Sequence, residues 1–137
     1  MRKLVLGVCI ALALWCNAAA ETNGVHVDVL SKTSSSWDGK ALPQWTPGTP
    51  EITILKITIP PGAELPLHKH PVINAGVLLS GRLKVTTEAG KTLTLRAGDP
   101  IVEVVDTWHS GKNEGDEPAE IIVFYAGKVG MPITITK

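Results

Sequence analysis

The segment His68-Lys69-His70-Pro71-Val72-Ile73-Asn74 brings two imidazoles and one side-chain amide into seven residues. In an extended chain, residues two apart point to the same side. His68 and His70 would then face one cavity, with Asn74 on the same side. His109 is the natural third partner, so the segment indicates a metal site. Spacing alone also allows two other interpretations, surface histidines or a hydrogen-bonded pair in the core.

Short β-rich runs follow one another after residue 50, separated by turn residues at intervals of roughly ten. No window after residue 20 shows a sustained apolar period of about 3.6 residues, so we predict an all-β sandwich or barrel. In the first run, Ile52 and Ile54 have one parity while Ile57 and Ile59 have the other. This change predicts a β-bulge near Leu55, or burial of both faces. The runs are 52–59, 75–79, 83–87, 92–95, 101–105, 119–125 and 133–136.

Residues 21–50 are rich in Ser, Thr, Gly and Pro and are expected to form an irregular arm. Within it, valines alternate over 25–29 in the manner of a short strand. Trp37 and Trp45 lie among turn formers, and we expect both rings to be covered. They would pack on the outside of the core or on a sheet edge, or else line the cavity mouth or a subunit interface.

The first 20 residues have the parts of a secretory signal peptide. Arg2 and Lys3 make the start positive, and the apolar run that follows is too short for a comfortable membrane span. Small residues end the segment at Ala20. We predict cleavage after Ala20 and a mature protein that is periplasmic or secreted.

Cys9 and Cys16 are the only cysteines, and both lie in the predicted leader. The mature chain would therefore have no disulfide and no thiolate ligand, and it would depend on its core. Without Arg2 and Lys3, 11 basic side chains remain against 13 acidic ones, a net charge near −2. No basic cluster survives, so nucleic acid is not an expected partner, nor is a membrane once the leader is removed. The remaining length suits a single core, a barrel domain over 51–137.

Two spaced motifs resemble those of the cupin superfamily. Gly62-x5-His68-x-His70-x3-Asn74-x6-Gly81 is similar to the first motif, with Asn74 where cupins usually have glutamate. Gly98-x5-Val104-x-Asp106-x2-His109-x3-Asn113 is similar to the second, with Val104 replacing the usual proline and Asp106 the usual glycine. The resemblance extends over about 51–125 and implies a small jelly-roll barrel, the double-stranded β-helix.

The resemblance also implies that His68, His70, Asn74 and His109 are the ligands of one divalent transition ion. Fe, Zn, Ni, Cu and Mn all remain open as its identity. An amide in place of a carboxylate leaves the full +2 charge on the ion, which strengthens its pull on an anion and weakens the site for Mn²⁺. The alternative for Asn74 is a hydrogen bond to a ligand or to the backbone, outside the ligand set.

Glu103 is the candidate catalytic acid or base. It shares its parity with Ile101 and Val105 on an apolar run, so it can point inward near His109. Glu64 and Tyr125 are further candidates, and for all three the alternative is a solvated strand residue.

Three classes of function fit these observations. The first is a metal-dependent enzyme, either an Fe²⁺ dioxygenase or a Lewis-acid isomerase or lyase, acting on a small oxygenated molecule. The second is a cupin that binds a small molecule, a sugar or a metal without turnover. The third is a structural module, since cupin-like domains often pair their sheets in a homodimer.

Overall fold

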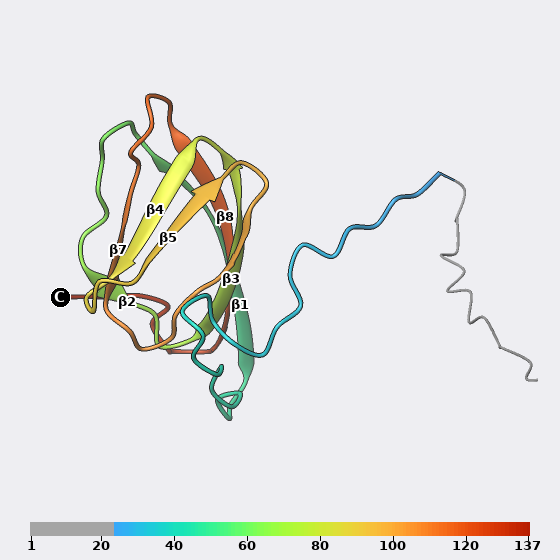
Figure 1. The fold of residues 1–137 in the computed structure, drawn as a ribbon. Coiled ribbons are helices and arrows are strands. Elements are labelled where there is room, and N and C mark those ends of the chain that lie inside the picture. Colours follow the sequence, from blue (N-terminus) through green and yellow to red (C-terminus); the bar gives the residue numbers. More distant parts are fainter. Residues whose placement is uncertain (1–23) are drawn as a thin grey trace, which may run out of the picture.

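The computed structural model describes residues 24–137, so the predicted leader lies outside it together with both cysteines. The described chain folds into nine β-strands (Figure 1). Within the same range, no helix is long and apolar enough to cross a membrane. The strands are β1 (Pro50–Ile59), β2 (His68–Lys69), β3 (Ile73–Ser80), β4 (Arg82–Thr87), β5 (Thr92–Arg96), β6 (Pro100–Val102), β7 (His109–Lys112), β8 (Ala119–Lys128) and β9 (Ile135–Thr136).

The strands form two antiparallel sheets that enclose the core. One sheet has the order β1-β8-β3-β6 and the other the order β5-β4-β7-β2-β9. Figure 1 shows β4, β5 and β7 in one layer and β1, β3 and β8 in the layer behind it. Neighbours such as β1 and β8 are far apart in sequence, as expected of a barrel rather than a simple meander. The all-β prediction is therefore confirmed.

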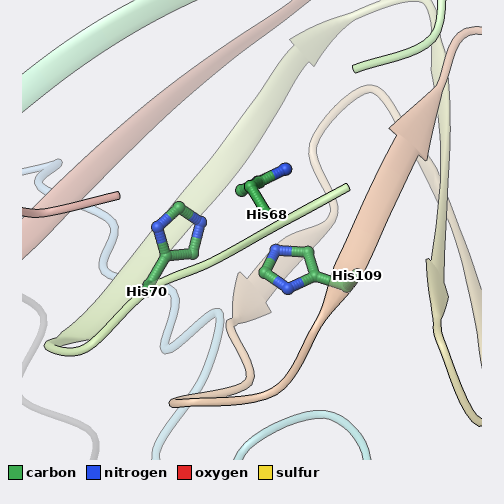
Figure 2. A group of neighbouring side chains, drawn as sticks. All are labelled: His68, His70 and His109. Carbon is green, nitrogen blue, oxygen red and sulfur yellow. The ribbon is translucent and has the colours of Figure 1, made fainter. Parts of the chain in front are cut away.

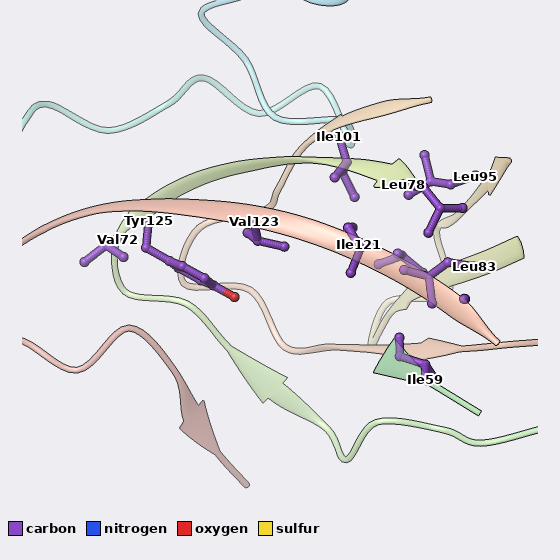
Figure 3. Packing of buried hydrophobic residues seen from close by; sticks show 11 residues of the cluster. Ile59, Val72, Leu78, Leu83, Leu95, Ile101, Ile121, Val123 and Tyr125 are labelled. Carbon is purple, nitrogen blue, oxygen red and sulfur yellow. The ribbon is translucent and has the colours of Figure 1, made fainter. Parts of the chain in front are cut away.

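The core lies between the two sheets and comes from alternate residues of each strand. On β8, Ile121, Val123 and Tyr125 point inward and are almost fully buried. Leu78 of the neighbouring strand β3 and Leu83 of β4, in the facing sheet, belong to the same buried cluster (Figure 3). This apolar packing holds the sheets together in a described chain that has no cysteine.

The structure corrects the prediction of a bulge near Leu55 in β1. β1 pairs with β8 in one unbroken register from Pro50 to Ile59. Leu55, Ile57 and Ile59 turn inward, while Ile52 and Ile54 lie on the outer face and are 63% and 58% exposed. Burial of both faces is thus wrong as well. The register shift of this sheet lies in β3, between Leu78 and Ser80.

The segment before β1 carries no strand in the described range, so the predicted strand over 25–29 is wrong. Its valines are exposed, and the stretch that carries them extends away from the barrel (Figure 1). Residues 34–42 fold back as a small loop, here called the arm hairpin, in which Leu42 N–H donates to the Ser34 carbonyl. Trp37 N–H donates to the carbonyl of Val102 at 2.9 Å, which attaches the arm hairpin to β6 at the sheet edge.

Candidate metal centre

Three histidines from two paired segments converge inside the barrel. His68 on β2 and His109 on β7 are direct partners across the strand pair. His70 follows β2 and pairs with Val105 in an isolated bridge. The ring centroids are 4.4 to 5.1 Å apart (Figure 2). One ring nitrogen of each histidine lies within 4.8 Å of the others, so the three can share one ion.

Each imidazole is oriented by a hydrogen bond to the backbone. Nδ1 of His68 lies 2.7 Å from the carbonyl of Pro66, and Nδ1 of His109 lies 2.8 Å from that of Thr107. Nδ1 of His70 lies 2.8 Å from the carbonyl of Ile133. A carbonyl oxygen can only accept, so Nδ1 must carry the hydrogen in all three rings. Each neutral ring therefore keeps the lone pair of Nε2 for a metal, which is the usual arrangement of ligating histidines.

Burial favours the neutral form of His68 and His70, which is the form that binds a metal. Desolvation is the main cause that lowers the pKa of His70, to about 4, although the Ile133 carbonyl raises it in part. Desolvation also lowers the pKa of His68, and the nearby His109 adds to this effect. Two of the three rings are thus unprotonated at neutral pH before any ion binds. The tautomer of all three rings and the charge of His68 and His70 therefore fit a divalent transition ion.

Asn74 lies on β3 and lines the same cavity as the three histidines. Its side chain is almost fully buried, and its Nδ2 donates to the carbonyl of Val72 at 3.4 Å. The amide oxygen is the atom that this side chain can offer to a cation. Asn74 therefore lines the cavity as a candidate fourth ligand or as a hydrogen-bond partner for a bound molecule.

Glu103 is buried next to the histidines. Its Oε1 accepts hydrogen bonds from the indole Nε1 of Trp37 at 2.8 Å and from the backbone N–H of Val104 at 2.9 Å. Its Oε2 lies 3.9 Å from Nε2 of His109. The carboxylate is thus fixed through one oxygen, while the other is directed to the site. Trp37 was missed as a partner of Glu103, because the residues around it show no periodic pattern that would place it.

The cavity beside the histidines has a volume of about 50 Å³ and mostly apolar walls, including Ile59, Leu83 and Val123. Tyr125 lines it and packs edge-on against His70, with ring centroids 5.3 Å apart. Burial, assisted by the charge of Glu103, raises the pKa of Tyr125 to about 12, so its hydroxyl stays protonated. Glu64 lies outside this cavity, exposed at the surface, where its Oε1 accepts from Ser110 at 3.4 Å.

An all-β barrel with buried, converging histidines defines a small metal-binding β-barrel protein. The family described as "Cupin domain" matches residues 55–125, more than half of the chain. The chain therefore belongs to the cupin family, as the two motifs imply. No curated protein matches the chain.

Solved cupin structures share the fold. The DMSP lyase DddQ from Ruegeria pomeroyi DSS-3 has 20% identity and a TM-score of 0.55, over 63% of this chain and 43% of the lyase. The oxalate decarboxylase from Lactobacillus farciminis, in a formate complex, has 26% identity and a TM-score of 0.51, over 65% of this chain and 27% of the enzyme. An oxalate oxidase in complex with the substrate analogue glycolate has 22% identity and a TM-score of 0.53, over 76% of this chain and 62% of the oxidase. The chain thus spans less than half of the lyase and about a quarter of the decarboxylase.

The variant Asn74→Glu tests whether residue 74 contacts the ion. A carboxylate there would add a negative oxygen ligand, which hard ions prefer. We expect Mn²⁺ to bind more tightly to the variant than to the wild-type protein, as measured by isothermal titration calorimetry. Unchanged or weaker Mn²⁺ binding would place residue 74 outside the ligand set.

Proposed function

We propose that this chain is an exported cupin that binds one divalent transition ion through His68, His70 and His109 and acts on a small oxygenated molecule. The observation that carries the proposal is the set of three Nδ1 contacts to backbone carbonyls, which leaves the Nε2 lone pairs free in a cluster whose ligand nitrogens lie within 4.8 Å of one another. The export part rests on the leader pattern in the sequence. The three imidazoles suit Fe²⁺, Zn²⁺, Ni²⁺ or Cu²⁺ as the ion.

The cavity supports a small substrate with oxygen atoms. A volume of about 50 Å³ leaves room for only a few heavy atoms, and most of the walls are apolar. A bound divalent ion would supply a Lewis acid that polarises an oxygen ligand. The protonated hydroxyl of Tyr125 can donate a hydrogen bond to the same molecule. The oxalate decarboxylase and the oxalate oxidase that share the fold act on oxalate and were solved with formate and glycolate, which are small carboxylates.

The chemistry that this site favours is proton transfer, as in a lyase or an isomerase. Within residues 24–137, both N–H donors to Glu103 bind its Oε1, whereas Oε2 lies beside His109. A carboxylate in this position can take a proton from a bound molecule and return it. An Fe²⁺ dioxygenase is the second candidate, favoured by the imidazole-rich ligand set, and oxygen uptake separates the two.

Elemental analysis tests the metal site. The purified protein should hold about one transition ion per chain, and a His68→Ala, His109→Ala double variant should lose it because two of three imidazole ligands are gone. His26→Ala is the matched control, since His26 is exposed and pairs with Asp28 on the arm. Full metal content in the double variant would refute the assignment.

The variant Glu103→Gln tests the proton role. It keeps the shape of the side chain but cannot accept a proton at neutral pH. Loaded protein would be screened with small carboxylates, keto acids and phenols, with product analysis and an oxygen electrode as readouts. We expect metal content to be unchanged and turnover to fall by roughly a hundredfold or more. Equal turnover in variant and wild type would exclude Glu103 as the acid or base. No turnover with any substrate would favour the non-catalytic binding function.

We further propose a homodimer through the outer face of the β1-β8-β3-β6 sheet. Ile54, Phe124, Ala75 and Val102 form one apolar row across its four strands, and Ile54 and Phe124 are about half exposed. With ~4.8 Å between strands and ~3.4 Å per residue, this face covers roughly 400 Å² per copy, about half of a standard interface. Leu30 of the arm lies against the same face, so the exposed apolar arm can add the remaining area.

Sedimentation velocity tests the dimer. The wild-type protein should sediment as a dimer at micromolar concentration, and an Ile54→Lys, Phe124→Lys variant should be a monomer because two charges would be buried unpaired. Thr94→Lys, at an exposed position on β5 of the other sheet, is the matched control and should remain a dimer. A wild-type protein that stays monomeric at all concentrations would contradict this interface.

A further inference from the structure

The arm hairpin contacts the candidate metal centre at two points. At the first, the indole Nε1 of Trp37 donates to Oε1 of Glu103 at 2.8 Å. At the second, Nζ of Lys40 donates to Oγ1 of Thr107 at 3.2 Å. The carbonyl of Thr107 is the group that orients His109. A segment far in sequence from Glu103 and His109 is therefore linked to both a candidate ligand and the carboxylate beside it.

The arm hairpin has the local structure needed to hold this position. Ser36 is buried, and its hydroxyl donates to Oδ1 of Asp38 at 2.7 Å, which also accepts from the backbone N–H of Lys40. Gly39 has a φ of +91°, a conformation that glycine adopts without strain. Lys91 Nζ donates to the carbonyl of Asp38 at 2.7 Å and ties the loop to the β4–β5 connection. Hydrogen bonds within the turn, together with the one from Lys91, thus hold the loop that presents Trp37 in place.

We propose that the arm hairpin is part of the metal centre, in which the Trp37 indole holds Glu103 beside the ion and keeps this carboxylate from becoming a ligand. This inference rests on the proposed metal function. It makes Trp37 a positioning residue, since the indole acts through Glu103.

The ion and the two N–H donors on Oε1 compete for the Glu103 carboxylate, and this competition is the physical reason for the proposed role of Trp37. Glutamate oxygens are ordinary ligands of transition ions, and Oε2 lies only 3.9 Å from the Nε2 that His109 offers. Two N–H donors on Oε1, from Trp37 and Val104, fix the plane of the carboxylate and stabilise its charge. A held carboxylate can exchange protons with a bound molecule, whereas a carboxylate that binds the ion is less basic. Loss of the indole N–H removes one of the two restraints.

The contact can be measured without any metal. The variant Trp37→Phe identifies the indole N–H signal of Trp37 in a ¹H–¹⁵N spectrum by its disappearance. In Glu103→Gln, this signal should shift upfield, because a neutral amide oxygen accepts more weakly than a carboxylate. The indole signal of Trp45, whose side chain is 70% exposed, should not move. An unchanged Trp37 signal in Glu103→Gln would overturn the proposed contact.

The effect of the Trp37–Glu103 contact on the metal centre is measured with Co²⁺ bound to the full chain. Trp37→Phe keeps an aromatic ring but frees Glu103, so the visible absorption spectrum of bound Co²⁺ should shift and Mn²⁺ should bind more tightly. In the Glu103→Gln background, the same substitution should change neither spectrum nor affinity, because no carboxylate remains to join the ligands. Trp45→Phe is the matched control and should behave as wild type.

The outcomes separate this inference from the proposed function. An equal effect of Trp37→Phe in both backgrounds would show that Trp37 only packs against the barrel, and no effect in either would show that Glu103 is not restrained; each result overturns the inference. A wild-type protein that takes up no Co²⁺ would refute the metal function instead. The indole signal would still report whether Trp37 holds Glu103.

Discussion

A hydrogen bond from each histidine Nδ1 to a backbone carbonyl ties the candidate metal centre to the fold. The carbonyls belong to Pro66, Thr107 and Ile133, in the segments just before β2, β7 and β9. These three strands are neighbours in one sheet, in the order β7-β2-β9. The tautomer of each ring therefore depends on the pairing of this sheet, and a slip by one residue would turn His68 away from the core.

The second sheet supplies the walls of the cavity and the groups that would contact a substrate. Asn74 on β3 and Tyr125 on β8 are direct partners in this sheet, and both line the cavity. Glu103 follows β6 at the edge of the same sheet, and its N–H donates to the carbonyl of Asn74 at 3.0 Å. The three candidate ligand nitrogens therefore lie on or next to one sheet, and the oxygen-bearing side chains of Asn74, Glu103 and Tyr125 lie on or next to the other. The arm hairpin closes the edge where Glu103 lies.

Much of this arrangement follows from the sequence, because strands can be recognised as short β-rich runs between turn residues. The β-rich runs over 119–125 and 83–87, bounded by turn residues, located β8 and β4. The motif spacing singled out His109 as the third partner of His68 and His70. Glu103 was found in the same way, since its parity placed it inward on an apolar run. These are local patterns, and the structure places each of these side chains in the cavity.

The parts that could not be predicted depend on contacts between distant segments. In the sequence, the change of parity among the isoleucines of β1 suggests a bulge. In the structure, the strand is regular and Ile52 and Ile54 lie on its exposed outer face. Nothing in the arm separates Trp37, which reaches Glu103, from Trp45, which stays exposed. Only the fold of the arm hairpin distinguishes them.

X-ray absorption spectroscopy of the Zn²⁺-loaded wild-type protein tests the central claim most directly. Imidazole rings give a multiple-scattering pattern that reports how many histidines surround the ion. The account predicts three imidazole nitrogens at about 2.0–2.1 Å. A first shell of oxygen atoms only, or one with a single histidine, would contradict it.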